Sequence, residues 1–403
     1  MSFLLHQLRP ANIAAELGRI RDKYLRKLRR VDQRVVTLEP TSSDGNVRGR
    51  VLLSYIIDPF LAGDSPELPH SHTHFWETWM IARAWRDLGY RVDAISWTNL
   101  SFELKHPYDV VIDVRLNLER LAPYLPGALK ILHTDTSHYT FNNPAQEARR
   151  QALTERRGIV LKPQRMLPEN RAAEHADAVV YLGNGFTGGT YAFACKPLFR
   201  VPVSVPFTYD WPAAKDFDAV RKNFLWFGSG GLVHKGLDLV LEAFAGLPDF
   251  HLTVCGPIRR ERDFEKAYFQ ELYQTPNIRT LGWIDVNGPD FIALARQTLG
   301  LVYPSCAEGG GSSALTCMHA GIIPLLTPET SVDLDTSYGV ELRDITVAGL
   351  REAIRELAAQ PADKLETMAR GAWEFARSQH SREHFETAYR DLAGRFSDGS
   401  WQT

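Results

Sequence analysis

The sequence predicts an α/β protein built from two doubly wound, Rossmann-like domains that face a cleft. Short apolar segments of strand length alternate with helical segments along most of the chain, and this alternation favours parallel sheets. The alternating series occurs twice, and Pro202, Pro206 and Pro212 mark the connection between the two series. At 403 residues, the chain is also long for a single hydrophobic core.

Four parts are expected along the chain. Residues 1–45 form an N-terminal helical extension and linker, and residues 46–208 form the first domain. Residues 209–375 form the second domain. Residues 376–403 form a C-terminal helix that either closes the second domain or packs back on the first.

In the first series, residues 36–49 are predicted to be a linker and residues 51–57 the first strand. The following helix has an apolar stripe and ends at Gly89. The stripe consists of Phe75, Trp79, Ala82 and Trp85. The later elements are strands at 92–96, 110–114, 130–133, 178–182 and 199–205, with a helical segment over 144–176.

In the second series, each apolar segment is followed by a helical one. The expected strands are residues 223–228, 251–256, 278–284, 299–303 and 322–326. The expected helices are residues 237–246, 261–273, 289–297, 312–318 and 376–396.

Composition indicates a soluble protein of the cytoplasm. A net charge of -2 gives no reason to expect nucleic-acid binding. No apolar run approaches the roughly 20 residues that span a bilayer, and the N-terminus lacks a signal-peptide pattern. The four cysteines show no CxxC pairing, and three lie in core-like segments, so reduced thiols are expected.

Residues 12–34 form a predicted basic amphipathic helix. The apolar positions at helical spacing are Ile13, Leu17, Ile20, Tyr24, Leu28 and Val31. Basic residues fill much of the remaining surface, so the helix either lies on the anionic inner face of a membrane or packs on protein.

Glu308 and the glycines after it form the first candidate ligand-binding corner. The strand over 299–303 precedes Glu308, and Ser312 or Ser313 can cap the next helix, which Gly321 ends. Glycine backbone can approach a ligand closely, and the N–H groups that open a helix favour an anion. A carboxylate beside such a loop suggests a phosphorylated sugar, and a tight turn with a solvated Glu is the alternative.

A second glycine corner follows the first strand of the second series. Gly228, Ser229, Gly230 and Gly231 precede Lys235 at the entrance of a helix. Because the carboxyl ends of parallel strands share one sheet edge, both corners should lie together. One cation and one set of helix N–H groups suit a diphosphate leaving group without a metal. The spacing does not match a Walker motif.

Three segments carry a resemblance to a known family. They are FGSGGLVHKGLDLVLEAF, LGWID and PSCAEGGGSSALTCMHAGIIPLL. Together they resemble the donor domain of the GT-B glycosyltransferases, specifically the retaining family 4 (glycosyl transferases group 1). The resemblance covers about residues 220–330 and is looser over 50–206, where the order of elements matches.

The resemblance implies roles for individual residues. It implies catalytic roles for Glu308, His133 and Lys235, with Glu308 on the sugar hydroxyls, Lys235 on the donor phosphate and His133 beside the transferred sugar. The implied donor-binding set is Ser229, Gly230, Gly231, Lys235, Gly282, Trp283, Glu308, Gly309, Gly310, Gly311, Ser312 and Thr316. Gly282 and Trp283 fall where the family's backbone meets the nucleobase.

Three positions depart from the family pattern. The second Glu of the E-x7-E motif falls on Thr316, which removes a charge-assisted hydrogen bond to the ribose. The donor Arg falls on Ser229 or Gly230, and Arg259 or Arg260 could replace it. The usual Gly-Gly of the first domain falls near Ser71 and His72.

A group of polar residues is assigned to the acceptor: His70, His72, His74, Asp135 and His138. His70, His72 and His74 are each separated by one residue, so their side chains would point to the same side of an extended backbone. A zinc site is the alternative for these histidines, but no carboxylate or cysteine completes it, and no metal is expected.

The predicted activity is therefore transfer of a sugar from a nucleotide-diphosphate sugar to a glycan or lipid-linked acceptor, with retention. Two alternatives stay open. One is a non-catalytic GT-B protein that binds sugar nucleotides or glycans, and the other is a sugar-nucleotide epimerase of the same fold.

Overall fold

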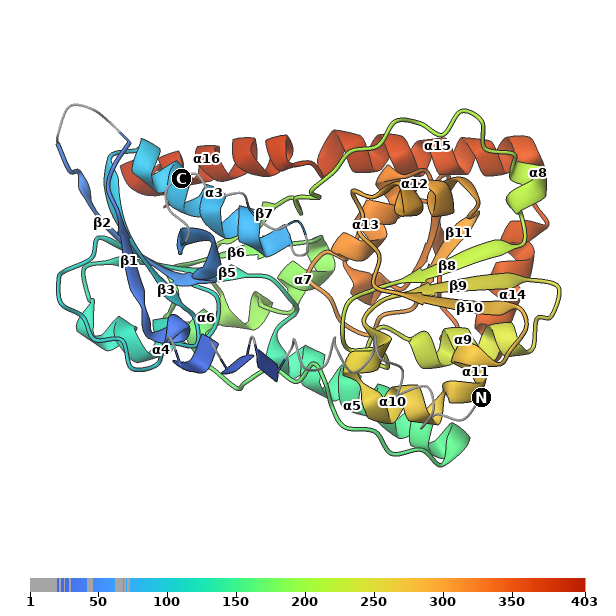
Figure 1. Cartoon of the computed structure of the whole chain (residues 1–403). Coiled ribbons are helices and arrows are strands. Elements are labelled where there is room, and N and C mark those ends of the chain that lie inside the picture. The colour runs from blue at the N-terminus through green and yellow to red at the C-terminus, as the bar shows by residue number, and fades with distance from the viewer. Residues whose placement is uncertain are drawn as a thin grey trace. The chain divides into compact units, whose positions relative to one another are not determined.

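The computed structural model describes residues 20–402, except 22, 25, 29, 42–45, 62–67, 69 and 71–72. The chain divides into two compact units (Figure 1). The first unit comprises the described residues within Met1–Thr134, Asn170–Val180 and Glu386–Thr403. The second unit comprises Asp135–Glu169 and Tyr181–Phe385.

The first sheet has the strand order β1-β3-β2-β4-β5-β6-β7. Its strands are β1 (Val35–Leu38), β2 (Gly49–Tyr55), β3 (Tyr90–Ser96), β4 (Val110–Asp113), β5 (Leu129–Thr134), β6 (Ala178–Leu182) and β7 (Leu198–Val201). The pairs of β2 with β3, β2 with β4 and β4 with β5 are parallel, as the βαβ pattern predicts. Strand β1 pairs antiparallel with β3, so the expectation that a linker begins at residue 36 is wrong.

The helices of the first half differ in detail from the sequence prediction. They are α3 (Thr73–Asp87), α4 (Asn117–Leu121), α5 (Tyr139–Arg157), α6 (Ala172–His175) and α7 (Gly185–Gly189). In α3, Ala82 and Trp85 are buried, whereas Phe75 and Trp79 are only half-buried. Helix α5 does not continue toward residue 176, because Gly158 ends it in the left-handed conformation.

The second sheet has the strand order β10-β9-β8-β11-β12-β13, and the paired strands run parallel. Its strands are β8 (Asn223–Phe227), β9 (His251–Cys255), β10 (Ile278–Gly282), β11 (Gly300–Tyr303), β12 (Ile323–Leu326) and β13 (Val340–Glu341). The short edge strand β13 has no counterpart in the sequence prediction. The other five strands confirm the expected series.

Helices flank this second sheet on both faces (Figure 1). They are α8 (Phe217–Val220), α9 (Leu237–Ala245), α10 (Arg262–Ala267), α11 (Phe269–Tyr273), α12 (Pro289–Arg296), α13 (Ser312–His319), α14 (Val347–Ala358) and α15 (Ala362–Gln379). Helix α16 (Arg382–Asp398) follows α15 in the chain, and most of it belongs to the first unit. The short 3-10 helices are η1 (Val31–Gln33), η2 (Asp58–Phe60), η3 (Ala122–Tyr124), η4 (Ala192–Ala194), η5 (Ile258–Arg260), η6 (Pro328–Thr330) and η7 (Ser400–Gln402). The single helix predicted over 376–396 is instead two, because α15 ends at Gln379 and α16 begins at Arg382.

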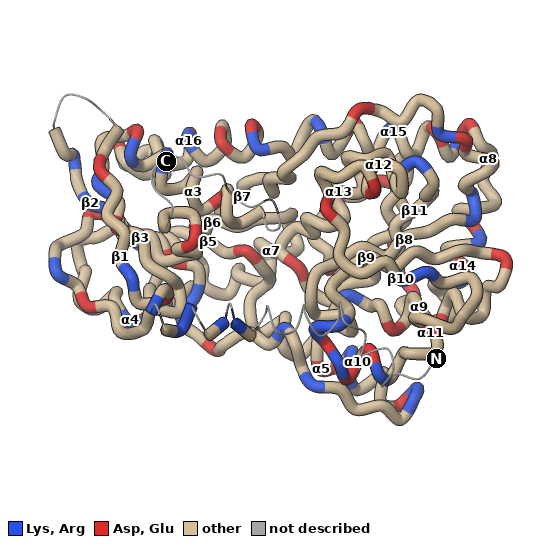
Figure 2. Tube along the Cα trace, in the orientation of Figure 1, with Lys and Arg blue, Asp and Glu red and all other residues tan. Residues whose placement is uncertain are grey.

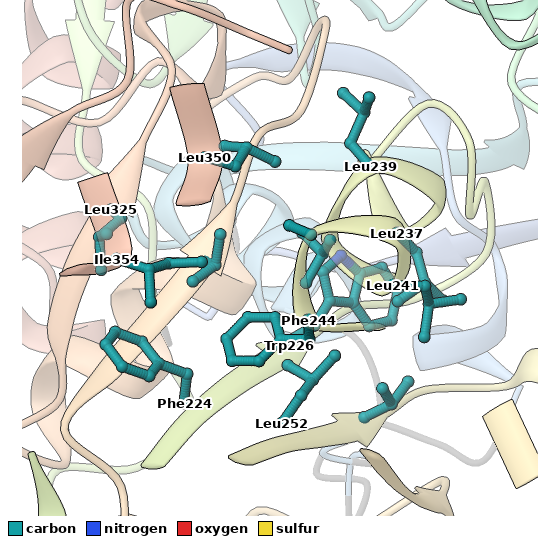
Figure 3. Close-up of a cluster of buried hydrophobic side chains, with 14 of the residues drawn as sticks. Phe224, Trp226, Leu237, Leu239, Leu241, Phe244, Leu252, Leu325, Leu350 and Ile354 are labelled. Atoms are coloured by element: carbon teal, nitrogen blue, oxygen red, sulfur yellow. The ribbon is translucent and has the colours of Figure 1, made fainter. Parts of the chain in front are cut away.

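The core of the second unit lies between its sheet and the helices α9 and α14 (Figure 3). Phe224 and Trp226 of β8 face Phe244 of α9, and Ile354 of α14 completes this side. Each fully buried large side chain contributes roughly 1.5–3 kcal/mol of transfer free energy. This burial holds the carboxyl ends of the strands, and the loops that follow them, in fixed positions.

Lys215 joins two helix ends inside the second unit. Its buried ammonium donates hydrogen bonds to Ala295 O of α12 (3.2 Å) and to Gly321 O just after α13 (2.8 Å). Burial lowers the pKa of Lys215 to about 7.

The last part of α16 packs within the first unit. Arg390 pairs with Asp87 of α3 at 2.7 Å, and Ser397 Oγ lies 3.1 Å from Tyr90 OH. Cys255, Cys306 and Cys317 are buried and Cys195 is exposed, and all four are free thiols, as expected. Within the described residues, no helix has both the length and the apolarity to cross a bilayer.

Two Rossmann-like sheets, parallel apart from the antiparallel pair of β1 with β3, confirm the predicted fold class. The proposed boundaries at 45, 208 and 375, and the cleft between the domains, stay predictions.

Candidate functional site

Lys235 lies in the loop between β8 and α9. The carbonyl of Lys235 accepts a hydrogen bond from Trp226 Nε1 (3.1 Å), and its N–H donates to Gly231 O (2.9 Å). The residue is 3% exposed. The core strand β8 therefore fixes the Lys235 backbone, and the side chain extends into the protein interior.

Glu308 follows β11, the strand that pairs with β8. Its N–H donates to Glu329 O (2.9 Å), and its carbonyl accepts from Ser137 Oγ (2.9 Å) and Thr187 Oγ1 (3.3 Å). The residue is 8% exposed. Because β8 and β11 are parallel neighbours, their carboxyl ends place both residues at one edge of the second sheet.

Lys235 and Glu308 form a buried ion pair. Lys235 Nζ bonds Glu308 Oε1 and also donates to Tyr303 OH (2.6 Å). Glu308 Oε1 accepts further hydrogen bonds from Tyr303 OH (3.1 Å) and Ser305 Oγ (2.9 Å). Within the described residues, Glu308 Oε2 makes no hydrogen bond. One carboxylate oxygen is thus held by three donors, and the other keeps its hydrogen-bonding capacity for a ligand.

The charge state of this cluster is set by its neighbours. Burial opposes the charge of Glu308, but the cations Lys235 and Arg165 outweigh burial and hold its pKa at about 2. Burial lowers the pKa of His234 to about 3, so this imidazole is neutral near pH 7. His234 Nε2 faces Ala307 O, and Nδ1 lies 3.6 Å from Cys306 Sγ. The site therefore contains one carboxylate, one ammonium and a neutral imidazole.

The glycine loop after β8 holds a carboxylate of the protein itself. Glu261, at the start of α10, accepts hydrogen bonds from the N–H groups of Gly231 and Leu232. Glu261 is buried, and burial raises its pKa against the effect of these two hydrogen bonds. The sequence predicted a ligand anion at this loop and did not indicate Glu261. Gly231 has φ +89°, which explains the glycine at that position.

The glycines of the other loop pack against protein backbone. A Cβ on Gly309 would lie 2.3 Å from Asp135 O, and one on Gly310 would lie 2.9 Å from the Gly183 backbone. Helix α13 begins at Ser312 after Gly311, and no side chain caps it, so the expected cap by Ser312 or Ser313 is wrong.

Thr316 is the residue at which the resemblance would place the second Glu of the motif. It is buried on α13, and its Oγ1 donates to Ser312 O (2.8 Å), one turn earlier in the same helix. This intrahelical hydrogen bond uses the donor of the hydroxyl, so only its acceptor capacity is left for a ribose.

The expected nucleobase residues lie at the end of β10. Gly282 has φ +82°, and its carbonyl accepts a hydrogen bond from Gly256 N (2.8 Å). Trp283 follows it and is 55% exposed, an unusual degree for a large aromatic side chain. Ser229 and Gly230 are half-buried in the loop after β8.

The expected acceptor residues fall in both units. In the first unit, His133 is buried with its ring 5.6 Å from that of Tyr55 and 5.9 Å from that of Tyr389. His74 Nδ1 bonds Glu77 Oε2 within α3, and His70 is exposed. His72 lies outside the described residues.

His138 and Asp135 lie in the second unit. His138 forms the N-cap of α5, where its Nδ1 lies 2.8 Å from Thr140 Oγ1. Asp135 carries the carbonyl beside Gly309. The roles assigned to these residues, and the pairing of His133 with Glu308, stay predictions. No three His, Cys, Asp or Glu side chains of the described chain come together in a way that could hold a metal.

Several residues of the cluster could not be assigned from the sequence. Tyr303, Ser305 and His234 are neighbours of the predicted residues along the chain, and that proximity was the available signal. Arg165 and Glu261 come from segments with no recognisable motif.

Two Rossmann-like α/β parts with this site at one sheet edge place the fold in the GT-B class. Residues 215–333 match the family model described as glycosyl transferases group 1. The match includes Lys235, Glu308 and both glycine loops. No curated protein sequence matches the chain significantly.

Solved structures agree with this fold assignment. Anabaena Alr3699/HepE, in complex with UDP and glucose, is similar with a TM-score of 0.54 at 13% identity, covering 87% of this chain and 100% of that one. WaaG, a glycosyltransferase involved in lipopolysaccharide biosynthesis, gives 0.52 at 15% identity, covering 87% and 99%. A mutant of S. aureus TarM, in complex with fondaparinux, alpha-GlcNAc-glycerol and UDP, gives 0.50 at 12% identity, covering 70% and 55%. This chain thus spans about half of the TarM chain.

Proposed function

We propose that the protein is a retaining glycosyltransferase that acts without a metal. It moves a sugar, of hexosyl type, from a nucleotide-diphosphate sugar to a glycan or lipid-linked acceptor. The observation that carries the proposal is the buried Lys235–Glu308 pair, which joins the ends of two neighbouring strands within the segment that matches the glycosyl transferases group 1 model.

Lys235 stabilises the leaving diphosphate in this mechanism. A cation that is already fixed in a water-poor site stabilises developing negative charge without reorganisation. Tyr303 and Glu308 fix the Lys235 ammonium at the sheet edge where the donor phosphates would lie. Phosphate oxygens that approach this ammonium would take over part of its interaction with Glu308.

Glu308 orients the sugar. Its Oε1 is held by Lys235, Tyr303 and Ser305, and its Oε2 can accept a hydrogen bond from a sugar hydroxyl. With its pKa at about 2, the carboxylate is charged at neutral pH and accepts such bonds strongly. The glycine loops, Gly282, Trp283, Ser312 and Thr316 complete the donor site.

Residues 46–208 bind the acceptor in this proposal. His133 approaches the transferred sugar, and His70, His72, His74, Asp135 and His138 contact the acceptor. HepE binds UDP and glucose, and TarM binds UDP with glycans, which supports a uridine donor as the first one to test.

A donor screen tests the proposal. Thermal shift with UDP-, GDP- and dTDP-sugars identifies the base, and transfer to candidate glycan acceptors then follows with the donor that binds. K235A and E308A should each lose transfer. If both variants transferred sugar at the unmutated rate, the proposed function would be wrong.

A non-catalytic binding protein is the second candidate, and two observations favour it. Thr316 cannot provide the charge-assisted bond that a Glu would give, and Glu261 occupies the N–H groups of Gly231 and Leu232. A donor-hydrolysis assay separates the candidates, because a binding protein would hold the donor without releasing sugar. Conversion of the donor without any acceptor would instead identify an epimerase.

The proposed location is the cytoplasm, at the inner face of the membrane. Of the predicted apolar positions, Ile20, Tyr24 and Leu28 are 54%, 65% and 65% exposed, and they share one side of a helical segment. Arg26 pairs with Asp58 and so ties this segment to the first unit. The triple variant I20S/Y24S/L28S should sediment less with anionic vesicles than the unmutated protein, whereas V35S, at an exposed position of β1, should not differ.

A further inference from the structure

We infer that the first unit binds an uncharged saccharide in a cavity on one face of its sheet. The cavity has a volume of about 390 Å³, which lies within the roughly 300–1,000 Å³ of small-molecule sites. Its lining residues all lie between Gln33 and Tyr108, within the first unit. The inference rests on this cavity and does not depend on the proposed function.

An irregular crossover creates the cavity. Strands β3 and β4 both run parallel to β2, which lies between them, so the chain that joins them crosses β2. Such a crossover is usually a helix. Residues 97–109, all of which the structure describes, instead contain no helix, as the trace between β3 and β4 in Figure 1 shows. A helix packed on this face would fill the space that the connection and the edge strand β1 line.

The cavity lies on the sheet face opposite helix α3. Tyr90 of β3 points toward α3, with its ring 5.2 Å from that of Trp85. Asp93, three residues later in the same strand, points to the other face because successive strand residues alternate. The cavity, which Asp93 lines, is thus on the face that α3 leaves uncovered.

A buried carboxylate, Asp93, forms the floor of the cavity. It accepts hydrogen bonds from Thr37 Oγ1 (2.6 Å), Arg50 Nη1 (2.7 Å) and Tyr108 OH (2.8 Å). Burial opposes the charge of Asp93, but these hydrogen bonds outweigh burial and lower its pKa. Arg50 and Tyr108 lie at the amino ends of β2 and β4, whereas the proposed acceptor residue His133 is near the carboxyl end of β5. The cavity is therefore a separate site.

Several polar groups of the lining keep hydrogen-bonding capacity. Arg50 uses only Nη1, and its Nε and Nη2 make no hydrogen bond to any described residue. Asn99 is buried, and its Oδ1 accepts from Ser101 Oγ (3.0 Å), whereas its Nδ2 makes no hydrogen bond within the part of the chain that the structure describes. The Ser101 hydroxyl can still accept. These groups offer a ligand donors and acceptors close together.

The charges around the cavity balance. The lining contains two permanent cations and two carboxylates: Arg50 and Lys105, and Asp93 and Glu103. His106 is a further, exposed titratable group of the lining. Figure 2 likewise shows basic and acidic residues interspersed in the first unit. With both signs equally represented, the lining does not favour an ionic ligand.

A saccharide matches this lining. Each sugar hydroxyl can both donate and accept hydrogen bonds, as the polar groups of the lining require. Phe102 and Tyr108 add aromatic surface, on which the C–H face of a sugar ring can pack. A phosphate or carboxylate ligand would instead bring its charge close to that of Asp93, which already pairs with Arg50.

Ligand-observed NMR titration of the full chain tests the inference. The probes are maltose, lactose and N,N′-diacetylchitobiose, with glucose 1-phosphate and glucuronate as charged comparators. At least one neutral saccharide should bind. S101W should weaken that binding at least about tenfold, because the indole and the ligand cannot occupy the same space. L100W adds the same side chain at a neighbouring exposed position outside the lining and should stay within about twofold.

R50K gives a finer test, because lysine keeps a positive charge beside Asp93 and removes the Nε and Nη2 donors. Binding of the same saccharide should weaken roughly threefold to tenfold, which is the loss of one or two hydrogen bonds. R91K is the control and should not differ, since Arg91 pairs with Glu39 outside the lining. Thermal unfolding of S101W and R50K checks that both variants are folded.

Three outcomes would overturn the inference. The first is that the protein binds none of the neutral saccharides. The second is that S101W binds them as the unmutated protein does, which would place them elsewhere. The third is that the charged comparators bind more tightly and are lost in S101W, which would make the cavity an ion site. If S101W does not fold, unchanged saccharide binding by R50K would overturn the inference. None of these outcomes bears on the proposed function, whose test is a nucleotide-sugar donor.

Discussion

The two glycine loops of the second unit look alike in sequence and differ in what they hold. The loop after β8 offers backbone N–H groups to an anion, which is the carboxylate of Glu261. The loop after β11 has Gly309 against the Asp135 carbonyl and Gly310 against Gly183, so its glycines allow close contact between protein segments. Glycines after a parallel strand can thus either expose backbone N–H groups to an anion or allow two protein segments to pack closely. Which of the two applies depends on residues from distant parts of the chain.

The largest effect is expected at the ion pair that joins the two loops. E308A leaves the Lys235 ammonium buried without its anion, so unfolding free energy should fall by about 3 kcal/mol or more. Sugar transfer should fall by at least about 100-fold. Urea denaturation and a transfer assay measure both effects. The control E352A, at an exposed position of α14, should change neither, and an E308A protein of unmutated stability would mean that the pair does not form.

Alanine at one glycine of each loop tests the comparison directly. G309A places its methyl group 2.3 Å from Asp135 O, and the backbone must shift, at a cost of about 2–3 kcal/mol. In G230A the nearest atom is Glu261 Oε1 at 3.6 Å, an ordinary contact, so stability should change by less than about 1 kcal/mol. Thermal unfolding of both variants measures the difference. Equal loss of stability in both variants would show that the two loops do not differ in how closely they pack against other segments.

The two carboxylates should respond oppositely to pH. Glu308 titrates near pH 2 in the folded protein and near 4.5 when unfolded, so its contribution of about 3 kcal/mol is present above pH 4.5 and is lost toward pH 2. Glu261 has a raised pKa, so its contribution is present below pH 4.5 and is lost as pH rises through the folded pKa. Urea unfolding from pH 2 to 8 of E308Q and E261Q measures these slopes. In E308Q the unfolding free energy should lose the pH dependence that Glu308 contributes, and in E261Q it should lose the pH dependence that Glu261 contributes.

The smallest expected effect concerns affinity. E261Q removes a negative charge from the loop where the diphosphate would bind, so pyrophosphate should bind several-fold more tightly at low salt. E341Q, at an exposed position of β13, is the control for a general change in net charge. Weaker binding by E261Q would mean that the carboxylate shapes the loop for the ligand and does not compete with it.

Much of the fold was predictable because the spacing of apolar residues, and the glycines and prolines that end strands and helices, are local properties of the sequence. The strands of the second sheet, except β13, follow from short runs of strand length, which end at Gly228, Gly256 and Gly282 in β8, β9 and β10 and at Pro304 in β11. Strand β1 was missed because it is an edge strand that pairs with β3 alone, and because the polar residues that follow it resemble a linker. The break between α15 and α16 was missed because nothing in the pattern near His380 interrupts helical spacing.

The candidate site was predictable in part. Lys235 and Glu308 each follow a strand, and the parallel order of β8 and β11 brings them together, so the sequence pattern contained this pair. Glu261 and Arg165 reach the same place from α10 and from the segment after α5, and a local pattern does not encode such long-range contacts. The predicted cap of α13 was wrong because Gly311, with φ +47°, takes the N-cap position, so Ser312 and Ser313 already lie in the first turn of the helix.

Lys215 gives helix α13 an asymmetric electrostatic character. An ammonium on the Gly321 carbonyl compensates the negative pole of the helix dipole, while the positive pole at Ser312 keeps its full strength. Because burial lowers the pKa of this ammonium to about 7, the compensation weakens as the pH rises through the neutral range. A proton at one end of α13 therefore sets how much of the negative pole remains, while the attraction of the start of the helix for an anion stays the same.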